Sequence, residues 1–156
     1  MTKEENRSAD QARAQLETIE QWHRVHEWAN NWHTVPEPKD LSREDRKWLL
    51  DEMDWAHDPD HEAVVDAIRD LVIDDPLELQ VRSEWHSLGE IAGSGEFRIL
   101  LCTGGPAVRI TGRLVDSEPS ESCIEHQDWG TPWTELEDSD CEALDWYASQ
   151  FNWEEA

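Results

Sequence analysis

The sequence predicts an α+β fold, in which N-terminal helices are followed by a small antiparallel sheet of three or four strands and by one C-terminal helix. Three observations predict this class. Apolar residues recur at three- and four-residue steps over residues 8–73, as on the inner face of a helix. From residue 77 onward they alternate with polar residues, as in strands. A last stretch, about 140–152, returns to helical spacing behind a capping Asp140.

A chain of 156 residues is long enough for one domain, or for one domain with an extension. We expect a helical acidic region over residues 1–75 and an α+β region over residues 76–156. The two regions are expected to pack as one unit.

Three helices are expected before residue 75, and the first, over about 8–32, ends before the prolines of residues 35–38. The second begins at Ser42, because Ser42–Asp45 resembles a capping box in which Asp45 replaces the usual Glu. The third spans about 60–73, and the short break before it predicts a helical hairpin. The expected inner residues of the three helices include Ala12, Leu16, Ile19, Trp22, His26 and Ala29, then Trp48, Leu49 and Met53, then Val64, Val65, Ile68, Leu71 and Val72.

Strands are expected at about 77–82, 97–102, 108–114 and 122–127, with Leu77, Leu79 and Val81 on the buried face of the first. The Gly104-Gly105-Pro106 step is followed by a strand rather than a helix, and no Walker lysine accompanies it. It therefore predicts a hairpin turn and not a phosphate-binding loop. Residues 116–119 are expected to form a second turn. The last helix should bury Ala143, Leu144, Tyr147, Ala148 and Phe151.

The composition is strongly acidic, with 37 acids against 13 bases and a net charge of −24. Such a surface repels nucleic acid and anionic lipid, so a partner recognised by charge should be basic.

The three cysteines have no CxxC spacing, which argues against a disulfide framework and a zinc site. No signal peptide or membrane-length apolar stretch is visible, and we expect a cytoplasmic protein. Ten tryptophans are expected to anchor the core.

Four motifs occur in order in the second half: DDPLELQVRSEWHSLGE, FRILLCTGGPAVRITGRL, EHQDWGTPWTEL and EALDWYASQF. Together they resemble a family of small phage and prophage proteins, over about residues 74–153. The chain departs from the family pattern at Glu84, where members usually have glycine, and in the ending Phe151-Asn152-Trp153. The resemblance implies a phage protein in the cytoplasm of a host cell, and it implies no particular chemistry. Residues 1–73 are outside it.

No established catalytic or metal motif is present, and we predict a protein that is not an enzyme and needs no cofactor. Two alternatives stay open. Arg98, Arg109 and Arg113 could form a small-ligand or phosphate-binding enzyme pocket, although pairing with Glu121 or Glu125 across the sheet is favoured. A metal could be bound by His57 with His61, or by His23 with His26.

Trp129 and Trp133 are expected to pack on the sheet face, and the alternative is that they form an exposed binding platform.

Acids recur at three- to four-residue steps along the second and third expected helices, which places carboxylates about 5–6 Å apart on one side of a helix. The expected partner-binding residues are Glu44, Asp51, Asp54, Asp58, Glu62, Asp66 and Asp70. Phosphates follow each DNA strand at about 7 Å, so such a ladder can imitate the edge of a duplex. This pattern favours an inhibitor of a basic nucleic-acid-binding host protein, either a restriction nuclease or a CRISPR effector.

Other interpretations of the same charge stay open. Helical surfaces are usually charged, and an acidic surface can serve solubility or a salt-loving host. A protein that acts by interaction could instead use an exposed tryptophan patch made of Trp22, Trp28 and Trp32.

Overall fold

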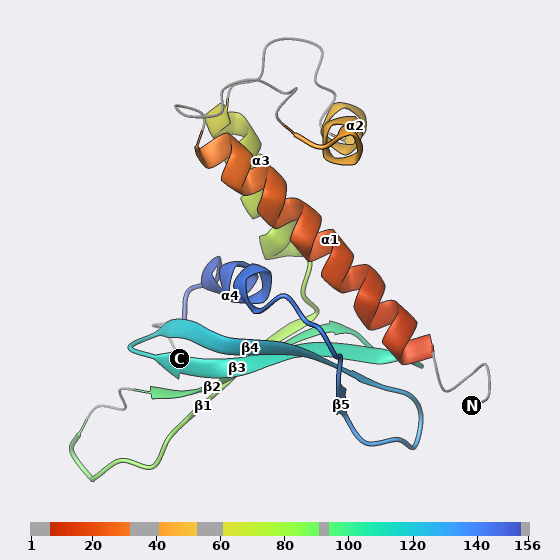
Figure 1. Ribbon diagram of the computed structural model, residues 1–156. Helices are drawn as coiled ribbons and strands as arrows, with labels where there is room; N and C mark the ends of the chain where they lie inside the picture. The colour runs from red at the N-terminus through yellow and green to blue at the C-terminus, as the bar shows by residue number, and fades with distance from the viewer. Residues whose placement is uncertain (1–6, 32–40, 53–60, 91–93, 154–156) are drawn as a thin grey trace.

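The computed structural model describes residues 7–31, 41–52, 61–90 and 94–153, and the fold is α+β as expected (Figure 1). Three helices come first, a five-stranded antiparallel sheet follows, and a short helix closes the described chain. The elements are α1 (Arg7–Asn30), α2 (Arg43–Glu52), α3 (His61–Asp74), β1 (Glu78–Ser83), β2 (Ser94–Cys102), β3 (Ala107–Val115), β4 (Glu118–Gln127), β5 (Thr134–Glu135) and α4 (Cys141–Ser149).

The sheet is a meander with strand order β1-β2-β3-β4-β5, one strand more than the largest number expected because of the two-residue β5. Gly104, with φ of 94°, turns the chain between β2 and β3, so the expected hairpin turn is confirmed. The next turn is tighter than expected: Asp116 and Ser117 both have positive φ, as in a type I′ turn. Strand β4 therefore begins at Glu118 rather than at Ser122.

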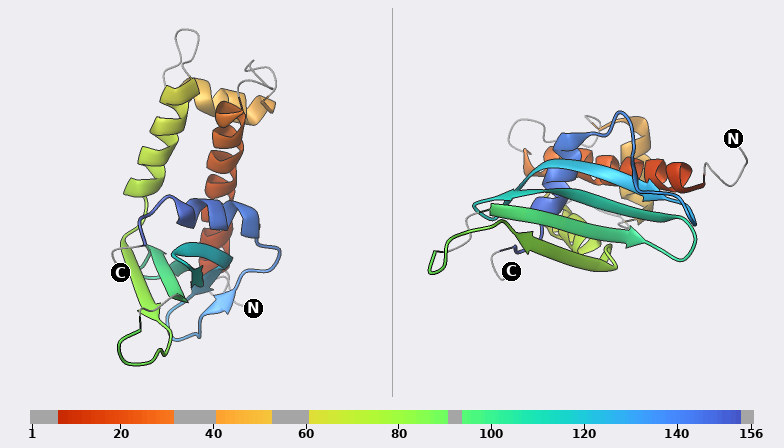
Figure 2. Two further views of the ribbon diagram at one scale, coloured as in Figure 1. Left: turned by 90° about the vertical axis from the view of Figure 1, so that its left-hand side faces the viewer. Right: turned by 90° about the horizontal axis from the view of Figure 1, so that it is seen from below.

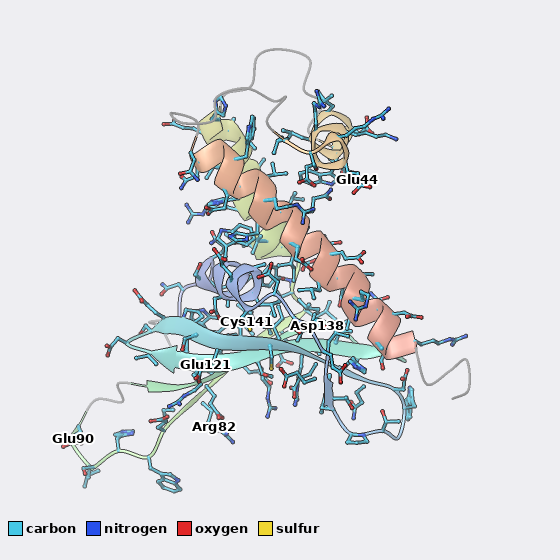
Figure 3. All side chains as sticks on the ribbon, in the orientation of Figure 1. Glu44, Arg82, Glu90, Glu121, Asp138 and Cys141 are labelled. Atoms are coloured by element: carbon cyan, nitrogen blue, oxygen red, sulfur yellow. The ribbon has the colours of Figure 1, made fainter. Side chains whose placement is uncertain are left out.

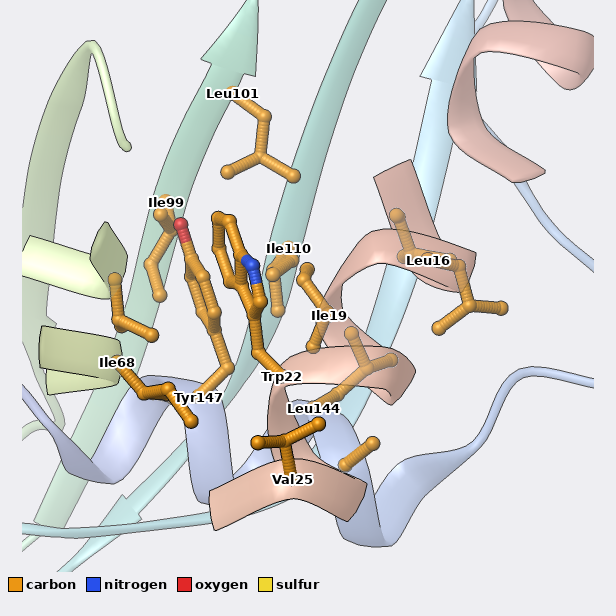
Figure 4. Close-up of a cluster of buried hydrophobic side chains, with 14 of the residues drawn as sticks. Leu16, Ile19, Trp22, Val25, Ile68, Ile99, Leu101, Ile110, Leu144 and Tyr147 are labelled. Carbon is orange, nitrogen blue, oxygen red and sulfur yellow. The ribbon is translucent and has the colours of Figure 1, made fainter. Parts of the chain in front are cut away.

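The helices cover only one face of the sheet (Figures 1 and 2). Helix α4 lies on β4, α1 contacts β3, β4 and α4, and α3 packs against α1. Residues from both the N-terminal and the C-terminal half contribute to a single hydrophobic cluster (Figure 4). On the sheet, the inner side chains are those of Phe97, Ile99, Leu101, Val108, Ile110, Leu114 and Ile124, in the alternation that the sequence predicts.

Two aromatic rings join α1 to α4 at the centre of this cluster. Trp22 and Tyr147 stack with an interplanar angle of 8° and 6.5 Å between ring centroids. The Tyr147 hydroxyl donates a 2.7 Å hydrogen bond to Asp75, just after α3. Burial raises the pKa of the Asp75 carboxyl, although the hydrogen bond from Tyr147 acts in the opposite direction. Burial also raises the pKa of the Tyr147 hydroxyl, and the neighbouring Asp75 carboxylate raises it further. Asp140 caps α4 as expected, because its side chain accepts from the Ala143 amide.

Helix α2 is held against α1 by an ion pair. Asp45 is almost fully buried and accepts hydrogen bonds from Arg24 Nε at 2.8 Å and Nη2 at 3.0 Å. Ser42 caps α2 as expected, since its hydroxyl accepts from the Asp45 amide. The predicted α2–α3 hairpin is wrong: within the described residues both helices pack against α1 instead (Figure 2). The sequence pattern misses this arrangement because Asp45 looks like a surface acid.

Strand β1 extends beyond the helical cover, and all six of its residues are exposed. The prediction of a strand here is confirmed, but the prediction that Leu77, Leu79 and Val81 are buried is wrong. Leu71 at the end of α3 is exposed as well, contrary to expectation. Strand β1 is the outermost strand of the sheet, and in the described chain no helix packs closely over it.

The inner face of the sheet depends on one close approach between strands. Phe97 lies over Gly112, its cross-strand neighbour, and is almost completely buried. A Cβ atom at Gly112 would lie 2.6 Å from the Phe97 ring and 2.9 Å from the Ser120 carbonyl oxygen. Only glycine accommodates the ring at this distance.

Gly112→Ala should therefore lower the free energy of unfolding by about 1–3 kcal/mol, because overpacking displaces a buried ring. Urea unfolding followed by tryptophan fluorescence measures the effect. Gly105→Ala is the matched control, since a Cβ atom there would have nothing within 4 Å. Equal stabilities of the two variants would contradict the tight packing at Gly112.

The Arg24–Asp45 pair should make stability depend on acid pH. Burial is the largest influence on the Asp45 carboxyl and raises its pKa, but hydrogen bonds from Arg24, Gln21 and Ser42 and the Arg24 charge outweigh it, so the folded-state pKa lies below the usual value. A carboxyl with a depressed folded-state pKa stabilises the fold above its unfolded pKa of about 3.9, and that stabilisation is lost as pH falls further.

Asp45→Asn should lower the unfolding free energy by about 1–2 kcal/mol at neutral pH, since half of the Arg24 side chain stays solvated when its partner is lost. The difference from the unmodified protein should shrink as pH falls below about 4. Thermal unfolding at several pH values tests this, with the exposed Asp51→Asn on the same helix as control. A difference that is constant with pH would show that the loss is one of packing alone.

Candidate functional site

The third helix presents a row of carboxylates to solvent. Glu62, Asp66, Asp70 and Asp74 are exposed and follow one another at four-residue steps, and we call these four residues the carboxylate stripe. Arg69 is the single base of α3. Neighbouring members of such a row lie about 5–6 Å apart on a helix. The structure therefore places three of the expected partner-binding residues, and Asp74 in addition, on one rigid element.

Helix α2 does not continue this row. Glu44 and Asp51 are exposed on it, and Glu44 projects next to α1 (Figure 3). Three bases are interspersed with them: Arg43, Arg46 and Lys47. Asp54 and Asp58 lie outside the described residues. The ladder expected on both helices is thus described on α3 alone, because the acids of α2 alternate with bases and one of them, Asp45, is buried in its pair with Arg24.

The sheet face opposite the helices carries most of the arginines of the second half. They surround an open hollow of about 540 Å³, and Arg82 extends from the sheet on the side away from the helices (Figure 3). The polar and charged side chains that line the hollow are those of Gln80, Arg82, Glu96, Arg98, Arg109, Thr111, Arg113 and Glu125. The expected Arg98–Arg109–Arg113 grouping therefore exists, with Arg82 added to it.

Carboxylates of the same face neutralise most of this positive charge. Arg109 donates to Glu125 at 2.8 Å, and its guanidinium lies 4.0 Å from the centre of the Trp133 ring. Arg113 contacts Glu84 at 3.2 Å and Glu121 at 3.8 Å. The predicted pairing with Glu121 and Glu125 is thereby confirmed. A further pair joins Arg82 to Glu96.

Arg98 differs from the other arginines of the hollow, because no carboxylate pairs with it in the described part of the chain. Its cross-strand neighbours on this face are Gln80 and Thr111. Thr111 in turn faces Cys123, with 3.3 Å between oxygen and sulfur. Burial raises the pKa of the Cys102 and Cys123 thiols, so both stay protonated at neutral pH and neither is activated as a nucleophile.

Two of the tryptophans proposed for an exposed patch are core residues. Trp22 and Trp28 are buried, and Trp32 lies outside the described residues. That expectation was wrong because indole groups at helical spacing here face α4 and α3 rather than solvent. Among the described tryptophans, Trp85 in the loop after β1 and Trp129 are exposed. The expected packing of Trp129 on the sheet face is therefore wrong. Trp133 does pack there, over Arg109.

Within the described residues, His23 and His26 are not part of a group of metal-binding side chains. Among the described residues, no three histidine, cysteine or acidic side chains group closely enough to hold a metal ion. Both rings instead pack on Trp146 of α4, with centroid distances of 5.2 and 5.1 Å. His57, the proposed companion of His61, is outside the described residues. Burial lowers the pKa of His26, so its neutral form fills the seam between α1 and α4.

Comparison with family models, curated proteins and solved structures finds no match for this chain. The resemblance of residues 74–153 to phage proteins therefore stays a prediction. None of the described helices combines the length and the apolar character that crossing a bilayer requires.

The neutral His26 should make the protein less stable in mild acid. Its folded-state pKa lies below the unfolded value of about 6.5, so the unfolded chain binds protons more readily and stability falls as pH decreases from about 7 to 5. In His26→Phe, which keeps an aromatic ring on Trp146, part of that decrease should disappear. Chemical unfolding at both pH values measures it, and an unchanged pH dependence in the variant would contradict the assignment.

Proposed function

We propose that the protein acts by binding, and that the carboxylate stripe of α3 is its contact surface for a basic protein. The observation that carries the proposal is the exposure of all four members on one packed helix. Val64, Ile68 and Val72 fix the opposite side of α3 in the core, so the stripe keeps its orientation. A rigid row of charges loses little entropy when a partner engages it.

The partner class follows from the geometry and the charge. Carboxylates about 5–6 Å apart approach the spacing of phosphates along a DNA strand, about 7 Å, so a groove that binds DNA suits the stripe. The net charge of −24 adds long-range attraction toward a basic surface and accelerates association at low salt. Binding of this kind weakens as salt screens the charges.

A nucleic-acid-binding host protein is the proposed target, either a restriction nuclease or a CRISPR effector, and the protein would inhibit it by occupying the DNA groove. Support for this narrower proposal comes from the phage-like motifs of residues 74–153. The acids after Asp116 are a further source of negative charge, since no Lys or Arg follows Arg113. The arginines of the open sheet face do not oppose the proposal, because most of them are paired with carboxylates of neighbouring strands.

The combined variant Asp66→Asn/Asp70→Asn should weaken inhibition of DNA binding roughly tenfold, because it removes the two central charges of the stripe. The measurement is competition between the protein and labelled DNA for purified restriction and CRISPR nuclease complexes at increasing salt. Asp66 and Asp70 are both exposed, so the fold should be unchanged by their substitution, and circular dichroism checks this.

Glu17→Gln/Glu90→Gln is the matched control, because it removes the same charge from exposed positions outside α3. It should retain inhibition. Equal losses in the two variants would show that total charge, and not the stripe, drives binding. Inhibition that does not change with salt, or its absence across the nucleases tested, would refute the mimic.

A further inference from the structure

Strand β1 presents an uncovered edge. It is the first strand in the order of the sheet and pairs only with β2, so half of its backbone hydrogen-bonding groups face outward. On the helix side of the sheet, Leu79 is 43% exposed and Val81 is 41% exposed. Natural proteins usually protect such an edge, or use it to pair with another strand.

The side chains of this strand are complementary to themselves. The strand reads Glu78-Leu79-Gln80-Val81-Arg82, with Gln80 at its centre. When two copies of it run antiparallel about Gln80, Glu78 lies opposite Arg82 of the partner subunit, and Leu79 lies opposite Val81 of the partner subunit. Residues directly opposite each other in an antiparallel pair lie on the same face of the sheet. Each acid therefore meets a base, and each exposed apolar side chain meets another.

We propose that two copies of the chain pair through β1, antiparallel about Gln80, and join their sheets into one continuous sheet. The interface is isologous, since the same strand serves both copies. The occupant of the edge is a second copy rather than an unrelated strand, because only an antiparallel partner with the opposite order of charge and the same central apolar pair satisfies both faces at once.

The charge distribution permits this contact despite the net charge of −24 on each copy. Arg82, Arg98 and Arg113 lie in the hollow beside β1, so the surface near the edge carries bases as well as acids. The acids of the rest of the molecule repel one another over longer distances, and salt screens that repulsion beyond about 8 Å at physiological ionic strength. Dimerisation should therefore strengthen as salt is raised from low values, which is opposite to the behaviour of binding to a basic partner.

The experiment is sedimentation velocity over a concentration series, at low and physiological salt, on the unmodified chain and three variants. Glu78→Arg places Arg opposite Arg82 of the partner subunit at two symmetric positions, and Arg82→Glu places two acids together in the same way. Each should weaken the dimer about tenfold, as like charges replace opposite ones in both pairs. The double variant Glu78→Arg/Arg82→Glu should restore dimerisation, and so should an equimolar mixture of the two single variants.

Both substituted positions are exposed, and the Arg82–Glu96 pair that Arg82→Glu removes is solvent-exposed and contributes little to the fold. Glu90→Arg is the control, because it makes the same charge change in the loop after β1 and should leave the dimer unaffected. A monomer at every concentration and salt would overturn the proposal. A dimer that both single variants leave intact would overturn it too, since the copies would then meet elsewhere.

Discussion

Coverage of one face of the sheet by α1 and α4 is the contact on which the rest of the structure depends. The stacked Trp22 and Tyr147 rings lie where the two helices meet, and the inner residues of β2, β3 and β4 pack beneath them. An aromatic pair contributes a large buried area from few residues, which suits a chain with only 37% hydrophobic residues. Because these helices pack on one face only, the charged side chains of the opposite face pair with one another. Strand β1 lies outside the area that the helices cover.

The two faces of the molecule treat charge differently as a result. On the open sheet face the strands place Arg109 beside Glu125 and Arg113 near Glu121, so opposite charges neutralise each other locally. On α3 the acids are separated by a full helical turn and share their helix with one base. The acids of the open sheet face are thus largely paired with bases across the strands, whereas the acids of α3 have a single arginine on their own helix.

The sequence predicts most of the fold because alternation and helical spacing depend on local geometry. The caps Ser42 and Asp140, the Gly104 turn and the inner residues of β2 and β3 all follow from such local rules. What it does not predict is which apolar face another element will cover. Leu71 and Leu79 fit their patterns and are nevertheless exposed, since coverage depends on the placement of α1.

In the candidate sites too, contacts set by local geometry can be predicted from the sequence, and contacts set by the placement of another element cannot. The stripe on α3 and the Arg109–Glu125 pair can be predicted from residue spacing, because the helix and the strand pair each fix their own neighbours. The Arg113–Glu84 contact cannot, since Glu84 is in a loop whose path spacing does not determine. Asp45 is a further case, because its burial arises from Arg24 on another helix. The exposed Trp85 has no periodic signal at all.

The contact between α1 and β4 joins segments that are far apart in the sequence, and this constrains the order in which the chain can fold. Helix α1 packs on β4, and Ser8 near its start donates a 2.7 Å hydrogen bond to Asp128, 120 residues later in the chain. The helix is synthesised first, yet the surface that receives it is completed only after most of the chain has left the ribosome. Until then the residues of α1 that pack on the sheet have no sheet to bury against, and long-range closure of this kind slows folding. The nascent chain thus carries the apolar side of α1, the longest of the described helices, without the sheet that later covers it, through most of translation.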